Sequence, residues 1–154
     1  MAAGTSPDSA PGEVHAEVAA RLATVGQSYT ANRSSLVELM VHSDQPLSIP
    51  EVLERHPELA QSSVYRNLAV LEEAGVVLRI VTGDEFARFE LAEAFTGHHH
   101  HHLICSQCGS VEDVTLPPSV EAIVVRELEG QARRRGFEPR GHQVDLIGHC
   151  ADCR

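Results

Sequence analysis

The first half of the chain carries apolar residues at the spacing of amphipathic helices. Val14, Val18 and Leu22 recur at every fourth position, which predicts a helix over residues 13–24 that ends before Gly26. The same periodicity returns three more times along this half. The further helices are expected after residues 29–33, where Leu36, Val37, Met40 and Val41 are apolar, then over residues 48–56 and over residues 61–74.

Local signals mark the ends of these later helices. Ser48 and Glu51 have the spacing of a capping box, and Pro50 stands in the first turn, where its missing N–H does no harm. His56 is expected to end that helix because it precedes a proline, and Gly75 is expected to end the next helix.

Two β-type runs follow the fourth helix. Residues 76–81 and 86–91 are joined by residues 82–85, which predicts a hairpin. Helices followed by such a hairpin make a winged helix-turn-helix, whose second helix places its first turn in the major groove of DNA. An ordinary polar helix start is the alternative interpretation. The candidate DNA-binding residues of this turn are Ser62, Ser63, Tyr65, Arg66 and Asn67, which can meet base edges or phosphates.

The second half of the chain predicts strands around one helix. Strands are expected over residues 98–104 and 111–116, Ser119 is expected to cap a helix over residues 120–134, and a last strand is expected over residues 137–147. The fold class is therefore α+β, with a winged helix-turn-helix domain before an α/β domain. The expected division is a disordered tail over residues 1–12, a winged-helix domain over 13–92, a hinge over 93–97 and a metal-binding domain over 98–154.

All four cysteines stand in two Cys-x-x-Cys pairs, Cys105 with Cys108 and Cys150 with Cys153. Two such pairs are the ligand set of a structural, tetrahedral zinc site. The segment between them is too long for a compact zinc ribbon, so a folded segment is expected inside the loop. Disulfides are the alternative, but no signal peptide is visible and a Cys-x-x-Cys disulfide closes a strained small ring.

Five consecutive histidines stand directly before the first cysteine pair. In a strand His98, His100 and His102 point to one face, while His99 and His101 point to the other. The run can therefore supply two metal sites back to back, each completed by other ligands. A solvated edge strand and an expression tag are the alternatives, and the internal position argues against a tag. The candidate partners are Glu90, Glu93, Glu112, Glu121 and His142.

The chain is acidic, with 22 carboxylate side chains, 12 arginines, no lysine and a net charge of −10. Acidic chains are poor candidates for nucleic-acid binding, so a DNA contact must come from a local arginine face. No apolar run approaches about 18 residues, so no membrane span is expected. The sequence has no nucleophile motif or Gly-rich motif, so neither an enzyme nor a small-molecule substrate is expected.

From about Val14 to Cys153 the chain resembles the ferric uptake regulator (Fur) family of metal-responsive repressors. The resemblance implies a cytoplasmic homodimer in which residues 98–154 also form the dimerisation domain. It further implies that metal at the hinge closes the dimer onto a palindromic operator in double-stranded DNA. The motifs that carry the resemblance are Y-T-A-N-R at 29–33, S-V-Y-R-N-L at 63–68, E-A-G-V-V at 73–77, R-F-E-L-A at 88–92, the histidines with Cys-x-x-Cys at 98–108 and G-H-C-A-D-C at 148–153.

The resemblance also assigns roles to individual residues. It implies that Tyr65 and Arg66 contact DNA, that Arg33 lies on the DNA backbone or in the minor groove, and that the four cysteines hold structural Zn²⁺. The implied sensor ligands are Glu90, His100 and His102, with Glu93 as the alternative carboxylate because the chain is longer here than in iron-type members. The implied second site consists of His99, His101, Glu121 and His142.

The sensor site departs from the family pattern. Pro46 or Leu47 stands where iron-type members have an N-terminal histidine ligand, and His42 is near but not aligned, so the fourth ligand is open. Zinc-sensing members usually have a cysteine just before the histidines, and this chain has none there. His101 stands where iron-type members often have aspartate. The expected regulatory ion is Fe²⁺ or Zn²⁺, with Mn²⁺ and Ni²⁺ also open. Peroxide sensing through histidine oxidation and zinc storage or metal delivery are the alternative functions.

Overall fold

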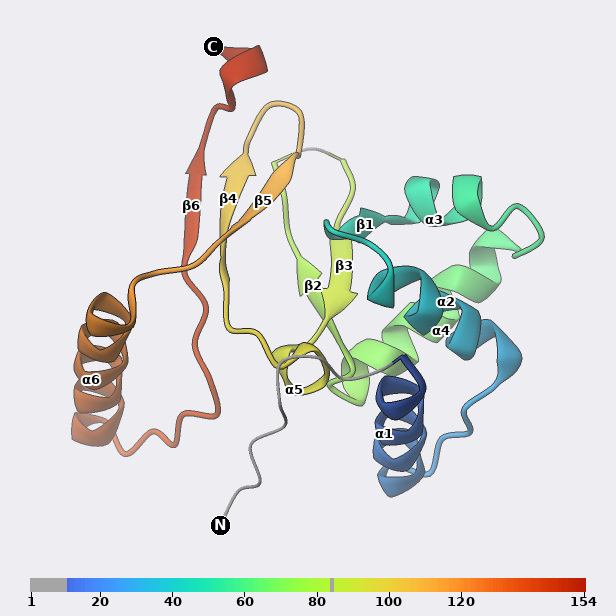
Figure 1. Ribbon diagram of the computed structural model, residues 1–154, viewed down its shortest axis with the longest axis horizontal. Helices are drawn as coiled ribbons and strands as arrows, with labels where there is room; N and C mark the ends of the chain where they lie inside the picture. The colour runs from blue at the N-terminus through green and yellow to red at the C-terminus, as the bar shows by residue number, and fades with distance from the viewer. Residues whose placement is uncertain (1–10, 84) are drawn as a thin grey trace.

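The four helices expected in the first half of the chain all form (Figure 1). They are α1 (Pro11–Thr24), α2 (Ala31–Val41), α3 (Ile49–Arg55) and α4 (Gln61–Glu73), in a computed structural model that describes residues 11–83 and 85–154. α1 begins inside the range predicted as a tail, and the rest of that tail lies outside the described residues. The apolar faces meet in one core with Val18, Leu36 and Leu68 at its centre. Burying such a side chain stabilises the fold by about 1.5–3 kcal/mol.

The predicted capping signals position the helix ends. The Ser48 side chain accepts a hydrogen bond from the Glu51 amide at 3.4 Å, and the Glu51 carboxylate accepts one from the Ser48 amide at 2.7 Å. At the start of α2 the Thr30 side chain accepts a hydrogen bond from the Arg33 amide. After α4 the chain reverses at Gly75, whose φ of +69° is a left-handed conformation that favours glycine.

A three-stranded antiparallel sheet, here called the wing sheet, packs beside these helices. It has the order β1-β3-β2, with β1 (Leu47–Ser48), β2 (Val77–Ile80) and β3 (Arg88–Leu91). Both strands of the expected hairpin form, and each is shorter than predicted. The short strand β1 was not predicted; Leu47 pairs with Phe89 in it, and this pairing buries both side chains.

The segment predicted as a hinge contains a short helix, α5 (Glu93–Thr96), which ends at Gly97 with a φ of +71°. Phe95 of this helix is 2% exposed and belongs to the core of the first half. The Arg21 guanidinium of α1 lies 5.6 Å from the centre of the Phe95 ring, which adds a cation–π contact. α5 is therefore anchored on α1 at the point where the chain passes to the second sheet.

The second sheet has the order β5-β4-β6, with β4 (His101–Cys105), β5 (Val111–Val114) and β6 (Asp145–Gly148). β4 is antiparallel to β5 and parallel to β6, and α6 (Pro118–Arg134) lies between β5 and β6 in the chain. The short 3-10 helix η1 (Ala151–Cys153) ends the molecule. The predicted α+β fold class is confirmed.

Several boundaries in this half were predicted wrongly. The strand expected from residue 98 begins at His101, because its partner β5 ends at Val114, opposite His101, and not at residue 116 as expected. The strand expected over 137–147 is reduced to β6. α6 has Pro117, not Ser119, at its N-cap. Within the described residues no helix is long and apolar enough to cross a membrane.

Candidate metal centres and DNA-facing helix

The four cysteines come together at one end of the second sheet and are here called the thiol cluster (Cys105, Cys108, Cys150, Cys153). The end of β4, the turn after it, the end of β6 and η1 each deliver a ligand, and the four sulfur atoms lie within 4.8 Å of one another. The Sγ atoms of Cys108 and Cys150 are 3.8 Å apart. A tetrahedral zinc with Zn–S bonds of about 2.3 Å requires S···S distances of about 3.8 Å. The cluster therefore fits a structural zinc ion.

Backbone amides prepare the thiol cluster for a cation. The amides of Cys108 and Cys150 hydrogen-bond the Cys105 sulfur and lower its pKa to about 5, and the Cys150 contact measures 3.4 Å. The Cys150 side chain and burial raise the pKa of Cys153 to about 12. The pKa of Cys108 is lowered as well, chiefly by hydrogen bonding with Ser110, so full deprotonation of the cluster is opposed at Cys153 and requires the positive charge that a bound zinc ion supplies.

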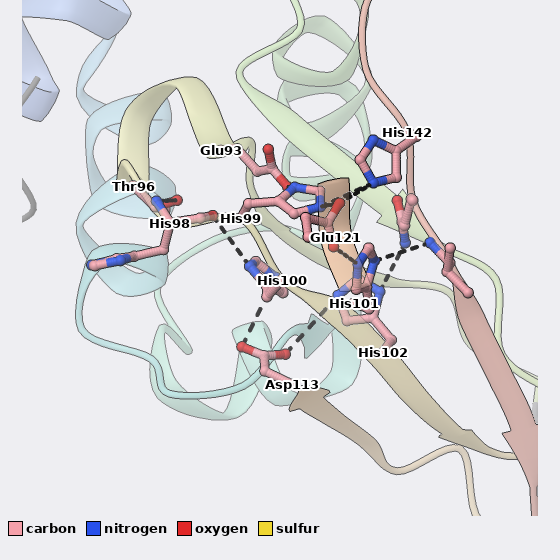
Figure 2. A network of polar contacts seen from close by, with 12 residues as sticks. Glu93, Thr96, His98, His99, His100, His101, His102, Asp113, Glu121 and His142 are labelled. Atoms are coloured by element: carbon pink, nitrogen blue, oxygen red, sulfur yellow. Dashed lines mark hydrogen bonds and ion pairs between the residues drawn. The ribbon is translucent and has the colours of Figure 1, made fainter. Parts of the chain in front are cut away.

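Two histidines meet two carboxylates between the two sheets, and this set is here called the strand cluster (Glu90, His100, His102, Asp113). Glu90 Oε1 lies 3.3 Å from His100 Nε2 and 3.1 Å from His102 Nε2. The Asp113 oxygens lie 3.9 Å from His100 and 4.0 Å from His102 (Figure 2). Two imidazole nitrogens and two carboxylates form a donor set that suits Fe²⁺, Zn²⁺ or Mn²⁺.

His102 is the most enclosed member of the strand cluster, with 1% of its side chain exposed. Burial lowers its pKa, but hydrogen bonds and charge from Glu90 and Asp145 outweigh that effect and raise the pKa above its ordinary value. Asp145 Oδ1 lies 3.1 Å from His102 Nδ1, on the side of the ring away from Glu90. This arrangement, a carboxylate behind a ligating imidazole, is common in metal sites.

The other face of the histidine run forms the helix cluster (His99, His101, Glu121, His142), which takes its carboxylate from α6. The Glu121 carboxylate lies 3.0 Å from His101 Nε2 and 2.6 Å from His142 Nε2 (Figure 2). His99 Nε2 and His142 Nε2 are 3.2 Å apart. Zn–N bonds of about 2.0–2.1 Å in a tetrahedron require N···N distances of about 3.3 Å. The donor set of three nitrogens and one carboxylate fits zinc.

The structure brings together most, but not all, of the residues proposed as metal ligands. Glu93, the alternative sensor carboxylate, contacts His99 Nδ1, behind the helix cluster. His42 lies on α2, where it pairs with Glu38 at 3.5 Å. Asp113 was not predicted, and it lies with Glu90, His100 and His102 as a candidate fourth ligand. The signal for it is register, because an antiparallel β4–β5 pair places Asp113 directly opposite His102 on the same face.

The predicted DNA-reading residues divide into two groups on α4. Ser62, Tyr65 and Arg66 are exposed, and the Tyr65 side chain is 52% exposed although it is a large ring. Ser63 and Asn67 are half-buried and hydrogen-bonded toward α2. The exposed group is free to meet a DNA groove.

A winged helix-turn-helix joined to a sheet with three clusters of metal-ligand side chains defines a metal-binding protein with a DNA-binding fold. Residues 24–147 match the model of the ferric uptake regulator family. The chain is 35% identical over 134 residues to the ferric uptake regulation protein of Campylobacter jejuni, covering 83% of this chain and 80% of that protein. It therefore belongs to the ferric uptake regulator family, as its sequence motifs predicted.

Other relatives show how broad this family is. The peroxide-responsive repressor PerR of Staphylococcus aureus is 27% identical over 143 residues, covering 90% of each chain. The Helicobacter pylori ferric uptake regulator has a TM-score of 0.71 at 20% identity over 97% of each chain, a likeness that supports the fold alone. Members of this family are DNA-binding transcription regulators, not enzymes.

Proposed function

We propose that this protein is a transcriptional repressor that binds a palindromic operator as a homodimer when a divalent cation occupies the strand cluster. One observation carries the proposal. Glu90 belongs to β3 of the wing sheet, whereas His102 and Asp113 belong to β4 and β5 of the second sheet. A cation held by all of these side chains supplies an attraction between the DNA-binding half and the second sheet.

Without a cation the strand cluster combines favourable and unfavourable contacts. Glu90 pairs with His100 at 3.3 Å and with His102 at 3.1 Å. Burial raises the pKa of Asp113 and the Glu90 carboxylate raises it further, while His100 and His102 lower it. A bound cation would offset the repulsion between the two carboxylates and so add to the attraction between the halves. Coupling between a sensor and a distant site is typically about 1–3 kcal/mol, which changes operator affinity about 5- to 150-fold.

Dimerisation is expected to use the surface of α6 and β6. No residue of these two elements is buried in the single chain, and Ile123, Leu146 and Ile147 are 50%, 68% and 66% exposed. A second copy of the chain covers such an apolar face and places two α4 helices on successive half-sites of double-stranded DNA. Tyr65 and Arg66 then meet base edges, and Arg33 meets the backbone. Because its partner is double-stranded DNA, we expect the protein to act in the cytoplasm.

The three clusters receive different roles in this proposal. The thiol cluster holds structural Zn²⁺ and the strand cluster is the sensor. The helix cluster is a second metal site that braces α6 against the histidine run. The Helicobacter pylori relative has three functional metal-binding sites, which supports this assignment. Fe²⁺ and Zn²⁺ are the favoured sensor ions, and Mn²⁺ and Ni²⁺ are the other ions to test.

The deciding experiment is operator binding titrated with Fe²⁺, Zn²⁺, Mn²⁺ and Ni²⁺ under anaerobic, reducing conditions, with zinc left in the thiol cluster. One ion is expected to tighten binding about 5- to 150-fold at a free concentration well below the others. If no ion changes DNA affinity, the histidine run stores or delivers metal and the repressor mechanism is wrong.

Matched variants assign the response to residues. His102→Ala is expected to abolish the metal response, while His98→Ala is expected to preserve it, because His98 belongs to the same run but to none of the clusters. Arg66→Ala is expected to weaken operator binding at full metal content. Normal operator binding by Arg66→Ala would contradict the role of α4.

Peroxide sensing is the second candidate function, because the Staphylococcus aureus repressor aligns over 90% of the chain. In that case Fe²⁺-loaded protein exposed to hydrogen peroxide gains oxygen on His100 or His102 and releases DNA. Peptide mass spectrometry detects the added oxygen. Unmodified histidines after full loss of DNA binding would exclude this mechanism.

A further inference from the structure

Four polar side chains link the N-terminal part of α2 to that of α4. Asn32 Nδ2 donates to Ser63 Oγ at 3.1 Å, and Arg33 Nε donates to Asn67 Oδ1 at 3.1 Å. Asn67 Nδ2 donates to Ser63 O at 2.9 Å and to Ser63 Oγ at 3.1 Å. This set, here called the amide network (Asn32, Arg33, Ser63, Asn67), connects the recognition helix to the helix before it.

The amide network uses the groups that Asn67 would need for reading a base. Asparagine reads adenine with one N–H donor and one oxygen acceptor on the same edge of its amide. Asn67 Nδ2 donates to both oxygen atoms of Ser63 within α4, and Oδ1 accepts from Arg33. Reading adenine would require Asn67 to break these hydrogen bonds in a half-buried position.

The network also fixes the direction of the Arg33 guanidinium. Nε is bound to Asn67, Nη1 donates to the Ser28 carbonyl, and among the described residues no hydrogen bond involves Nη2. A guanidinium held through Nε and Nη1 cannot rotate, so its remaining donors keep one orientation. Arg66 differs, because it is exposed and its Nε makes a longer contact, 3.3 Å, with the Ser62 carbonyl of its own helix.

We propose that Asn67 is a positioning residue that holds Arg33 for a DNA phosphate and reads no base itself. The proposal rests on the proposed DNA-binding function and changes the role that the sequence suggested for Asn67. Base selection is left to Tyr65 and Arg66, which are exposed on the same helix. A phosphate contact positions the protein on DNA without selecting sequence.

A double-mutant cycle on metal-loaded protein tests this role. Arg33→Ala and Asn67→Ala are each expected to weaken binding about tenfold or more on every DNA sequence, since each removes a charge-assisted hydrogen bond. Each substitution is also expected to make binding less sensitive to salt. The slope of log affinity against log salt concentration falls in magnitude by about one for every phosphate contact that is lost. The double variant is expected to bind like Arg33→Ala alone. Gln61→Ala, an exposed change in the first turn of α4, is the matched control and keeps wild-type affinity.

Other outcomes of these measurements would contradict a positioning role for Asn67. If Asn67→Ala keeps the salt slope but loses discrimination at one base pair, Asn67 reads that base and the proposal is wrong. Additive losses of affinity in the double variant would also overturn it. If Asn67→Ala folds poorly, the test can be repeated in an Arg33→Lys variant. Lysine keeps the positive charge, but its single nitrogen cannot be fixed in orientation as the guanidinium is. In that background Asn67→Ser is expected to have no further effect on DNA affinity, and an effect would contradict the proposal.

One measurement separates this proposal from the proposed function. In the free protein, exchange of the Arg33 Nε–H with solvent, followed by NMR, is expected to be slow in the wild type and fast in Asn67→Ala. Equal exchange rates would show that Asn67 does not hold Arg33, whether or not the protein binds DNA. Failure of wild-type protein to bind any operator would instead refute the proposed function.

Discussion

At the residue scale, His102 is fixed from both sides of its ring. Its Nε2 faces Glu90 and its Nδ1 faces Asp145, which lies opposite it in the β4–β6 register. Gln143 Nε2 donates to Asp145 Oδ1 at 2.9 Å. In the tautomer whose Nδ1–H donates to Asp145, the Nε2 lone pair of His102 is directed at the strand cluster. Asp145 therefore belongs to the metal site although it is not a ligand.

Replacing this carboxylate is predicted to weaken metal binding without removing a ligand. Asp145→Asn is expected to lower the metal affinity of the strand cluster about 10- to 100-fold, because His102 loses basicity and orientation. Chelator competition measures this affinity in a Glu121→Ala background, where the helix cluster lacks its carboxylate. Glu112→Gln, an exposed change on the other face of β5, is the control. Equal affinities for Asp145→Asn and the control would show that Asp145 has no such role.

At the element scale, the sequence predicted what local chemistry decides. The ends of α3 followed from Ser48, Glu51 and His56, residues that act within their own turn. β1 was not predicted, because a strand of two residues is too short to show an alternation of apolar and polar positions. The strand exists only through the pairing of Leu47 with Phe89. Asp113 and Asp145 were not predicted either, because the register between strands decides which side chains face His102. The cysteine pairs and alternating histidines were recognisable because their spacing is local.

The capping box of α3 gives a pH-dependent prediction. Burial alone would raise the pKa of Glu51, but hydrogen bonds from Ser48 and the charge of Arg88 outweigh it and lower the pKa below its ordinary value of 4.5. A lowered pKa in the folded state means that the carboxylate stabilises the fold above about pH 4.5, and that this stability is lost as pH falls through the folded pKa. Glu51→Gln is therefore expected to destabilise α3 by about 0.5–1 kcal/mol at pH 7.

Amide hydrogen exchange of α3 measures this difference at several pH values. The gap between Glu51→Gln and the wild type is expected to close as pH falls, because protonation makes the two side chains alike in charge. Glu54→Gln, an exposed change on the same helix, serves as the control and is expected to change little at either pH. A gap that persists below the folded pKa would contradict the electrostatic explanation.

At the scale of the whole molecule, the turn that holds the first cysteine pair rests on the wing sheet. Arg88 of β3 donates from Nε to the Gly109 carbonyl in that turn and pairs through Nη1 with Glu51 at 3.0 Å. Ile80 of β2 is buried in one small cluster with Ile104 and Val111 of the second sheet. The thiol cluster thus lies at a second junction between the halves, apart from the strand cluster.

The backbone of the wing also approaches the cysteine turn closely at Gly83, after β2. A Cβ added there would lie 2.6 Å from the Ser106 carbonyl oxygen and 2.9 Å from Ser106 Cα, both backbone atoms that cannot rotate away. Gly83→Ala is therefore predicted to push the wing away from the cysteine turn at a cost of about 1–3 kcal/mol. Operator affinity at saturating metal is expected to fall about tenfold or more, with zinc content unchanged. Gly12→Ala, whose added Cβ meets no atom within 4 Å, is expected to bind as the wild type. Unchanged operator affinity in Gly83→Ala would show that only the strand cluster, and not this junction, sets the position of the DNA-binding half.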